Sequence, residues 1–507
     1  MVADRQGGGN RRRGGLLHLL AGVLLIASSA AAQAEVPSMP QVTPVPPSGK
    51  APLSSATRKT DPGTEYIDLA KHGYVEEEYY MSGVAPAITA DGKALFDVPY
   101  ITRILVRKPK DPKKFNGTVV IDPFTWFGER GASWIMTRDY LVREGYAYVG
   151  YTINMTKPEI DPKTVSDPDP LYEKRREINL DFMRTYDYAR YAPLGTYYDP
   201  ARFERGGLPD PFIPQAQGIG AQLALLLKSN LPTGPLNGLN VSRVYVNSWA
   251  VTAQVWMDYL DQGRHQQWRM PDGRPLIDAY MTGRMNFGIF GKRPYRVRMP
   301  HAMPADAPFV MIYSQNETLY DVTYGYTSPP DSDQPKYRVY DVLGASHLRL
   351  ADFGTWEIEQ TPADFGKGDD PRCTTYYDEP FEVVASALLD GMDRWVRTGT
   401  PMRKAPRAVL RTKGVVRDPV DGNMVGGVRP PWIKVPAATY MTMYENDCQS
   451  ILESKVPYDR ARLRRLYGTY GNYARKYEAA KRESIKEGFL LPEDAARVTP
   501  VAKGSDF

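Results

Sequence analysis

Apolar runs alternate with amphipathic stretches through most of the chain. The runs carry hydrophobic side chains at consecutive positions, which is typical of strands buried on both faces of a parallel sheet. They predict strands over 117–124, 147–153, 241–247, 307–314 and 336–344. The amphipathic stretches place apolar residues three or four positions apart, as one face of a helix requires. They predict helices over 133–145, 218–230, 253–263 and 381–399.

Strands that alternate with helices predict an α/β fold, with a mainly parallel central sheet and helices on both of its faces. Ahead of this region, the segments 76–88 and 94–109 are rich in β-branched and aromatic residues and predict antiparallel strands. Behind it, the segment 458–498 predicts a helical tail, which either packs on the domain or binds a partner. Its apolar residues recur at helical spacing, at Leu463, Leu466, Tyr470, Tyr473 and Tyr477.

The N-terminus has the three parts of a secretory signal peptide. Arginines at 11–13 form the basic part, an apolar stretch follows, and Ala-Gln-Ala at 32–34 fits a cleavage site. We therefore expect residues 1–34 to be removed on export to the periplasm or the extracellular space. An uncleaved anchor is the alternative, but the apolar run is short for a membrane span. The Pro-rich segment 35–63 predicts a disordered linker, and 64–500 a single domain.

The charge of the chain is almost balanced once the signal is removed. The whole sequence has 64 basic and 59 acidic residues, but four basic residues and one acidic residue lie within 1–34. This balance gives no reason to expect a nucleic acid partner. No span is expected to remain in the membrane after cleavage.

Cysteine and histidine are scarce. Cys373 and Cys448 predict one disulfide bond in an exported protein, with two separate buried thiols as the alternative. The histidines are scattered, and the sequence has no HExxH pattern and no paired cysteines, so no metal site is expected. No glycine loop of the phosphate-binding kind occurs, and no cofactor is expected.

One histidine lies where a catalytic base would be placed. Parallel α/β sheets carry their reactive groups in the loops that follow the carboxyl ends of strands. Of the five histidines, only His347 follows a predicted core strand, in VYDVLGASHLRL. That position suits a general base, although a structural histidine fits it equally well. Glu317 and Asp321 follow the strand at 307–314, and Glu317 is preferred as the acid that orients the imidazole because it is nearer the strand end.

The junction VYVNSWAVTAQVW joins a predicted strand to a predicted helix, as the turn that presents a hydrolase nucleophile does. If Ser248 were at the tip of this turn, Val246 would lie two positions before it, and a β-branched residue fits such a strained turn poorly. If Ala250 is at the tip, its neighbours are Ser248 and Thr252, which fit better. Ala250 has no nucleophilic atom, however, and G-x-S-x-G occurs nowhere in the chain.

Seven segments carry a family resemblance over residues 66–498. They are GYVEEEYYMSGVA, REGYAYVGYT, RYAPL, YDVLGASH, SALLDGMDRWVRTGTPM, VVRDPVDGNMVGGVRPPWIKVPAATY and EGFLLPEDA. In this order they resemble the secreted α/β-hydrolase-domain family of bacterial and fungal proteins. The resemblance implies an α/β-hydrolase fold and an esterase-like activity.

The family's turn reads Gly-x-Ser-Gln-Ser/Thr-Ala/Gly, and the matching residues here are SWAVTA at 248–253. The resemblance therefore places Ala250 at the nucleophile position, Glu317 at the acid and His347 at the base. The glycine, the serine and the glutamine of the family pattern are all replaced. Three departures together indicate natural divergence rather than a single inactivating change.

Oxyanion-hole donors would then be the backbone N–H of Val251 and one N–H from Phe124, Thr125 or Trp126. Trp249 could line an aromatic pocket or belong to the core.

Three functions remain open from the sequence. The first is an ester hydrolase with a shifted nucleophile such as Ser248. The second is a non-hydrolytic relative that binds a small ester, acyl or aromatic ligand, or that uses His347 and Glu317 as a general acid and base. The third is a structural role for the tyrosine-rich surface and tail. The sequence therefore does not decide whether the active site is functional.

Overall fold

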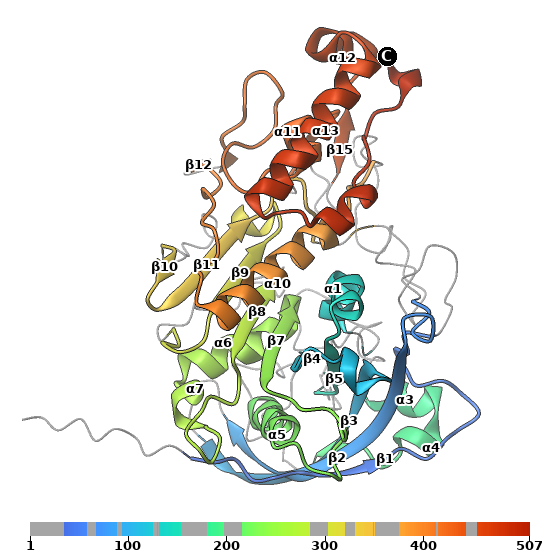
Figure 1. Cartoon of the computed structure of the whole chain (residues 1–507), viewed down its shortest axis with the longest axis vertical. Coiled ribbons are helices and arrows are strands. Elements are labelled where there is room, and N and C mark those ends of the chain that lie inside the picture. Colours follow the sequence, from blue (N-terminus) through green and yellow to red (C-terminus); the bar gives the residue numbers. More distant parts are fainter. Residues whose placement is uncertain are drawn as a thin grey trace, which may run out of the picture. The chain divides into compact units, whose positions relative to one another are not determined.

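Parallel pairing joins the middle strands of one large sheet, and antiparallel strands extend it at both edges (Figure 1). The strand order is β1-β2-β3-β5-β4-β7-β8-β9-β11-β10, with β6 paired to β3. Neighbours from β5 to β11 in this order run parallel, and the other pairs run antiparallel. The computed structural model describes residues 35–57, 67–88, 94–124, 129, 131–153, 180–196, 215–283, 303–319, 330–347, 349, 375–411, 414–442 and 454–507.

The element bounds follow the apolar pattern of the sequence. The sheet strands are β1 (Gln41–Pro44), β2 (Tyr74–Ile88), β3 (Ala94–Pro109), β4 (Thr118–Pro123), β5 (Ala147–Tyr151), β6 (Gly195–Thr196), β7 (Arg243–Trp249), β8 (Ala279–Gly283), β9 (Phe309–Tyr313), β10 (Ser332–Asp333) and β11 (Lys336–Asp341). Two small hairpins pair β12 (Leu410–Arg411) with β13 (Gly414–Val415) and β14 (Ala438–Tyr440) with β15 (Lys455–Pro457). The helices are α1 (Ala132–Arg143), α3 (Leu180–Tyr186), α4 (Tyr188–Tyr191), α5 (Ala216–Lys228), α6 (Ala253–Asp261), α7 (Arg264–Gln267), α10 (Phe381–Thr398), α11 (Pro431–Lys434), α12 (Arg460–Tyr467) and α13 (Tyr470–Glu487).

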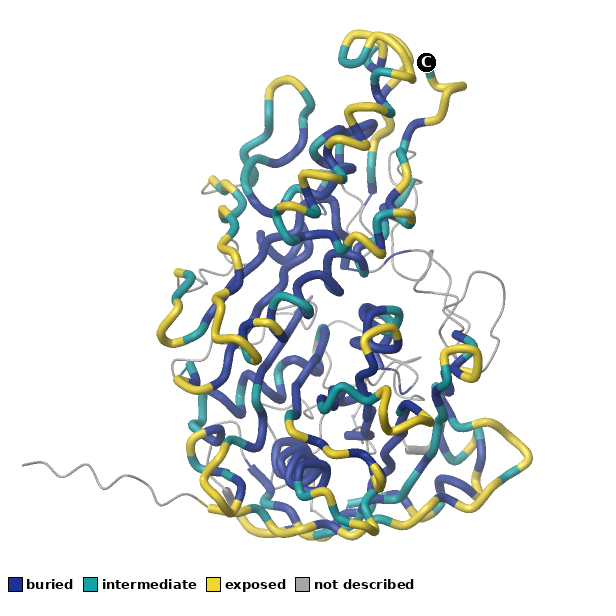
Figure 2. Tube along the Cα trace, in the orientation of Figure 1, coloured by how far each residue is buried: buried dark blue, intermediate teal, exposed yellow. Residues whose placement is uncertain are grey.

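Helices cover both faces of the sheet, as predicted. Alternate residues of each central strand point to opposite faces, so two apolar cores form. Val119 and Val244 belong to the core that contains α5 and α6. Val120 and Tyr245 belong to the core that contains α1, α10 and the C-terminal helices. Figure 2 shows the central strands as buried along almost their whole length.

Two elements differ from the sequence prediction. Strand β8 was not predicted, although all five of its residues are buried. The predicted helical tail is two helices rather than one, because Gly468 ends α12 with φ of 74° and Thr469 begins α13 by accepting a hydrogen bond from the Asn472 N–H. The tail packs on the main domain through buried residues such as Tyr473.

The predicted disordered linker over 35–63 is wrong for the part that the structure describes, residues 35–57. Strand β1 pairs with β2 along four residues at the sheet edge. Further on, Leu53 is completely buried. Prolines in this segment therefore belong to an edge strand and its connections, where the missing N–H is tolerated.

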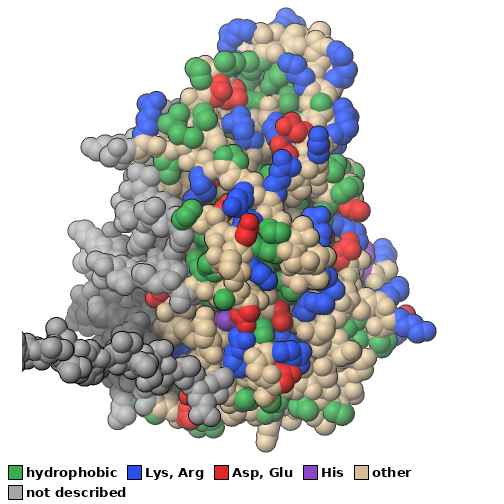
Figure 3. All heavy atoms as spheres, turned by 60° about the vertical axis from the view of Figure 1, so that its left-hand side comes forward, with side chains coloured by type: hydrophobic (Ala, Val, Ile, Leu, Met, Phe, Trp, Pro, Cys, Tyr) green, Lys and Arg blue, Asp and Glu red, His purple; other side chains and the backbone are tan. Residues whose placement is uncertain are grey.

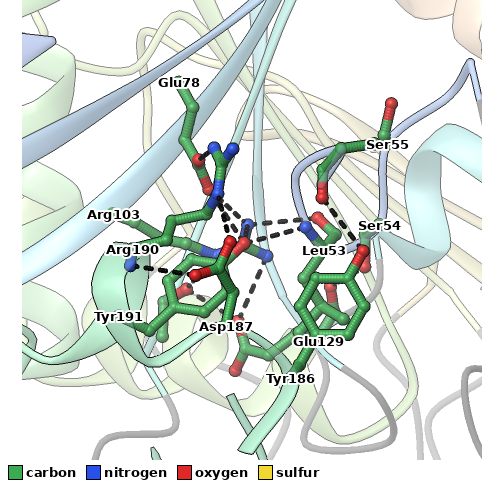
Figure 4. A network of polar contacts seen from close by, with 12 residues as sticks. Leu53, Ser54, Ser55, Glu78, Arg103, Glu129, Tyr186, Asp187, Arg190 and Tyr191 are labelled. Carbon is green, nitrogen blue, oxygen red and sulfur yellow. Dashed lines mark hydrogen bonds and ion pairs between the residues drawn. The ribbon is translucent and has the colours of Figure 1, made fainter. Parts of the chain in front are cut away.

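A buried network of charged side chains holds this N-terminal segment in place (Figure 4). Arg103 of β3 donates to the Leu53 carbonyl at 3.1 Å and to Glu78 of β2 at 2.7 Å. Arg190 of α4 also pairs with Glu78 and donates to the Ser48 hydroxyl at 2.9 Å. Composition alone does not reveal such pairing, because the partners lie far apart in the sequence.

Residues Ala34–Phe507 form one compact unit. In the described part of the chain, no helix is both long and apolar enough to span a membrane. On the face seen in Figure 3, Lys and Arg side chains lie among Asp and Glu side chains over much of the surface.

Candidate active site

The chain turns sharply from β7 into α6 through a short 3-10 helix, η4 (Ala250–Thr252). Ala250 has φ of 54°, in the left-handed region that residues with a Cβ seldom adopt. The neighbouring Trp249 fixes the strand end. Its indole N–H donates to Asn247 at 2.7 Å, and its ring packs edge-on against Phe381.

The two hydroxyls beside Ala250 are both buried. Ser248 lies within β7, paired with Thr282 of β8, and its side-chain oxygen has no hydrogen-bond partner among the described residues. The hydroxyl of Thr252 donates to the Trp249 carbonyl at 2.8 Å. Neither hydroxyl is accessible to a ligand in solution.

His347 and Glu317 are in direct contact. His347 Nδ1 lies 2.6 Å from Glu317 Oε1, and both side chains are buried. The second carboxylate oxygen of Glu317 accepts the Ser314 N–H at 2.6 Å. Because a carboxylate can only accept, Nδ1 carries the proton and Nε2 is left as the basic nitrogen. Nε2 has no partner among the described residues.

Strand register places these residues at one edge of the sheet. Trp249 pairs with Gly283, Gly283 with Ile312, and Ile312 with Tyr340, so β7, β8, β9 and β11 end at a common level. Ala250 follows this level directly. The loops with Glu317 and His347 start from the same edge, as expected for parallel strands.

The remaining histidines have other surroundings or lie outside the described residues. His265 is buried, with Nδ1 2.8 Å from the Tyr280 hydroxyl and Nε2 2.7 Å from Asp306, so both ring nitrogens are occupied. Hydrogen bonds from His265 and Arg269 hold the pKa of Asp306 well below its usual range. His72 is exposed at the surface. His18 and His301 lie outside the described residues, and so does Asp321, the alternative acid.

Two of the predicted pocket residues belong to the core instead. Phe124 donates its N–H to the Tyr151 carbonyl at 2.8 Å, so this N–H is not available as an oxyanion donor. Trp249 is buried, and its indole covers Gly283 so closely that a Cβ there would lie 2.4 Å from the ring. Val251 lies in η4. Thr125 and Trp126 lie outside the described residues.

Asp122 is a buried carboxyl that the sequence reasoning did not single out. It lies near the end of β4 and accepts the Tyr148 hydroxyl at 2.8 Å and the Ser133 N–H at 3.1 Å. Burial raises the pKa of Asp122 to about 7. The aspartate inside the apolar run GTVVIDPF was the signal that could have revealed it.

Cys373 and Cys448 lie outside the described residues, so their disulfide bond stays a prediction. Within the described residues, no cluster of three or more His, Cys, Asp or Glu side chains could hold a metal ion.

Comparisons with known proteins address the family. The family model described as "Alpha/beta hydrolase domain" matches residues 41–500. No curated protein matches the chain.

Solved structures with a distant likeness include three esterases. An esterase from Pyrobaculum calidifontis has 10% identity, a TM-score of 0.24, and coverage of 54% of this chain and 78% of its own. Esterase 2 of Thermogutta terrifontis has 9% identity, a TM-score of 0.25, and coverage of 52% of this chain and 83% of its own. Esterase B of Lactobacillus rhamnosis has 13% identity, a TM-score of 0.26, and coverage of 52% of this chain and 76% of its own. TM-scores this low support no conclusion about the fold or the function of this protein. The assignment rests on the family model, whose match spans nearly the whole described chain: this protein belongs to the alpha/beta hydrolase domain family.

Proposed function

We propose that this protein is an exported hydrolase relative that binds a small ester or acyl ligand and acts on it without a covalent serine intermediate. The observation that carries the proposal is a complete acid–base pair at the same sheet edge as a nucleophile position that lacks a nucleophilic atom. His347 is bonded to Glu317, whereas Ala250 occupies the left-handed residue of the strand–turn–helix with only a methyl group. A base and an acid without a nucleophile still form a coherent site for proton transfer.

The local geometry disfavours a shifted nucleophile. Ser248 is fully buried in a strand, and moving it to the tip of the turn would shift β7 by two residues against β8. Thr252 would have to give up its bond to the Trp249 carbonyl. Both changes oppose the packing that holds the turn, so neither hydroxyl is assigned as nucleophile.

The chemistry proposed for His347 is general-base catalysis. Nε2 takes a proton from a water molecule as the water oxygen bonds to the carbonyl carbon of the ester. The C–O bond to the alcohol then breaks, and the protonated imidazole returns the proton to the leaving oxygen. Glu317 stabilises the imidazolium between these steps. The N–H of Val251 and one from the Thr125–Trp126 segment are the proposed donors to the developing oxyanion.

The native protein is expected to hydrolyse activated aryl esters slowly and to resist a fluorophosphonate probe. Slow turnover follows because water replaces a positioned serine, and resistance follows because Ser248, the serine nearest the turn in sequence, is buried. Rates with short-chain aryl esters and mass spectrometry of probe-treated protein measure both. The variant H347A should reduce the rate to that of buffer.

The other functions would give different results. Labelling of Ser248 would contradict the proposal and establish a covalent hydrolase with a shifted nucleophile. Absent turnover would favour a ligand-binding relative without catalysis. Turnover that survives in H347A would contradict the role of His347 as the base.

Export is expected to leave Glu35 as the first residue of the mature protein. Glu35 already lies against the folded domain, where its N–H donates to the Gln267 carbonyl at 2.7 Å and its own carbonyl accepts the Arg269 N–H at 2.8 Å. A chain that begins at Glu35 therefore keeps these two contacts. N-terminal sequencing of protein secreted with its full leader tests this, and a start beyond Glu35 or an intact leader would contradict it.

A further inference from the structure

Gln315 links the loop of the proposed acid to the loop of the proposed base. It lies two residues before Glu317 and is completely buried. Its backbone N–H donates to the Ala345 carbonyl at 2.9 Å, and its side-chain oxygen accepts the Gly344 N–H at 2.9 Å. His347 follows Ala345 by two residues. The same glutamine thus joins both loops, through its main chain and through its side chain.

The side-chain nitrogen of Gln315 extends this link to the C-terminal part of the fold. It donates to the Tyr377 hydroxyl at 2.9 Å and to the Tyr440 carbonyl at 3.0 Å. If the amide were flipped, its oxygen would face the Tyr440 carbonyl and its nitrogen would face the Gly344 N–H, and neither pair can form a hydrogen bond. These partners therefore fix the orientation of the amide.

The described residues after α10, namely 400–411, 414–442 and 454–507, form what we call the C-terminal layer. This layer also contacts the base loop directly, because the Trp432 indole N–H donates to the Gly344 carbonyl at 3.0 Å. Gly344 has φ of 65°, and a Cβ there would lie 2.8 Å from the Trp432 nitrogen. The close approach of the two segments thus requires glycine at this position.

We propose that Gln315 is a positioning residue that sets the geometry of the His347–Glu317 pair and ties it to the C-terminal layer. The inference rests on the proposed function for its catalytic meaning. Its structural content is that the buried amide of Gln315 joins the acid loop to the base loop through Gly344, and to Tyr377 and Tyr440 through its nitrogen. The C-terminal layer is then part of the site rather than a separate appendage.

The test compares two buried glutamines with the same number of side-chain hydrogen bonds. Gln315→Met keeps the length of the side chain and removes its three bonds. Gln222→Met is the matched control, because buried Gln222 of α5 bonds the Tyr100 hydroxyl, the Ser38 hydroxyl and the Val84 carbonyl, far from the pair in the strand order. Both substitutions should lower the unfolding temperature to a similar extent.

The readout is the NMR signal of the His347 Nδ1 proton in histidine-labelled mature protein, assigned by its loss in H347Q. We expect Q315M to shift or lose this signal and Q222M to retain it. In a background with Ala250→Ser, Q315M should lower kcat about tenfold and leave KM within about twofold. Tyr377→Phe, which removes one partner of the amide, should give a smaller change in the same direction if Q315M does not fold.

Two outcomes would overturn the proposal. An unchanged His347 signal in Q315M would mean that the His347–Glu317 pair does not depend on the Gln315 amide. If Q315M does not fold, an unchanged signal in Tyr377→Phe would mean the same. Loss of the signal in both glutamine variants would make the effect one of general destabilisation. Because the NMR signal needs no turnover, a site without hydrolytic activity leaves this test intact and is recognised separately by the kinetic assay.

Discussion

Replacing Ala250 with serine is expected to produce a covalent ester hydrolase. The turn already holds position 250 at φ of 54°, and the bond between His347 and Glu317 is already made, so the substitution adds only the missing hydroxyl. A serine activated by a neighbouring imidazole attacks an ester far faster than a water molecule does. We expect aryl-ester turnover to rise about a hundredfold or more over the native protein. Steady-state kinetics and labelling at position 250 by a fluorophosphonate measure the gain.

Matched variants separate this effect from chance reactivity. A250S/H347A should lose both turnover and labelling, because the serine then has no base. A250S/S248A should keep both, since Ser248 is buried in β7 and takes no part. A folded A250S protein that stays unlabelled and inactive would mean that the turn and the acid–base pair do not converge, and the proposed site would be wrong.

Replacing Asp122 with asparagine is expected to stabilise the protein above pH 7. Burial raises the pKa of this carboxyl from 3.8 to about 7, so the folded state holds its proton more tightly than the unfolded chain does. The stability that this group contributes is complete below about pH 4 and is lost as the pH rises toward 7. The shift corresponds to about 4 kcal/mol. Asparagine is neutral throughout, and its oxygen can still accept from Tyr148 and Ser133.

Denaturant unfolding of both proteins from pH 5 to pH 8 measures this difference. The stability of D122N relative to the native protein should increase over this range. Part of the gain is offset, because the new amide N–H₂ takes the place of Asp122 Oδ1, which has no described hydrogen-bond partner, and a buried N–H₂ without an acceptor is unfavourable. Asp272→Asn is a suitable control, because Asp272 is exposed, bonds to Arg274, and has a pKa that this bond lowers. A difference between D122N and the native protein that does not change with pH would show that Asp122 does not titrate as described.

The periodicity of apolar residues predicted the positions of strands and helices well wherever an element packs against the core. The strand at 309–313 and the helix at 381–398 were predicted within a few residues, because their apolar side chains repeat at the period of the structure. Strand β8 was missed, since AYMTG is short and mixes apolar with polar residues. The N-terminal segment was misjudged for a related reason. Its prolines resemble a linker in composition, while its buried Leu53 depends on Arg103, fifty positions away.

The sequence by itself determined the α/β class, the alternation of most of the central strands with helices, and the choice of Ala250, Glu317 and His347. Each of these follows from periodicity, from scarce residue types or from a family resemblance. Only the tertiary structure decided that Glu317 touches His347, that Ser248 is buried, and that Phe124 and Trp249 belong to the core. It also revealed Gln315, whose partners come from three separate segments. Contacts between distant segments depend on how the sheet and its loops pack, and a one-dimensional pattern does not record that packing.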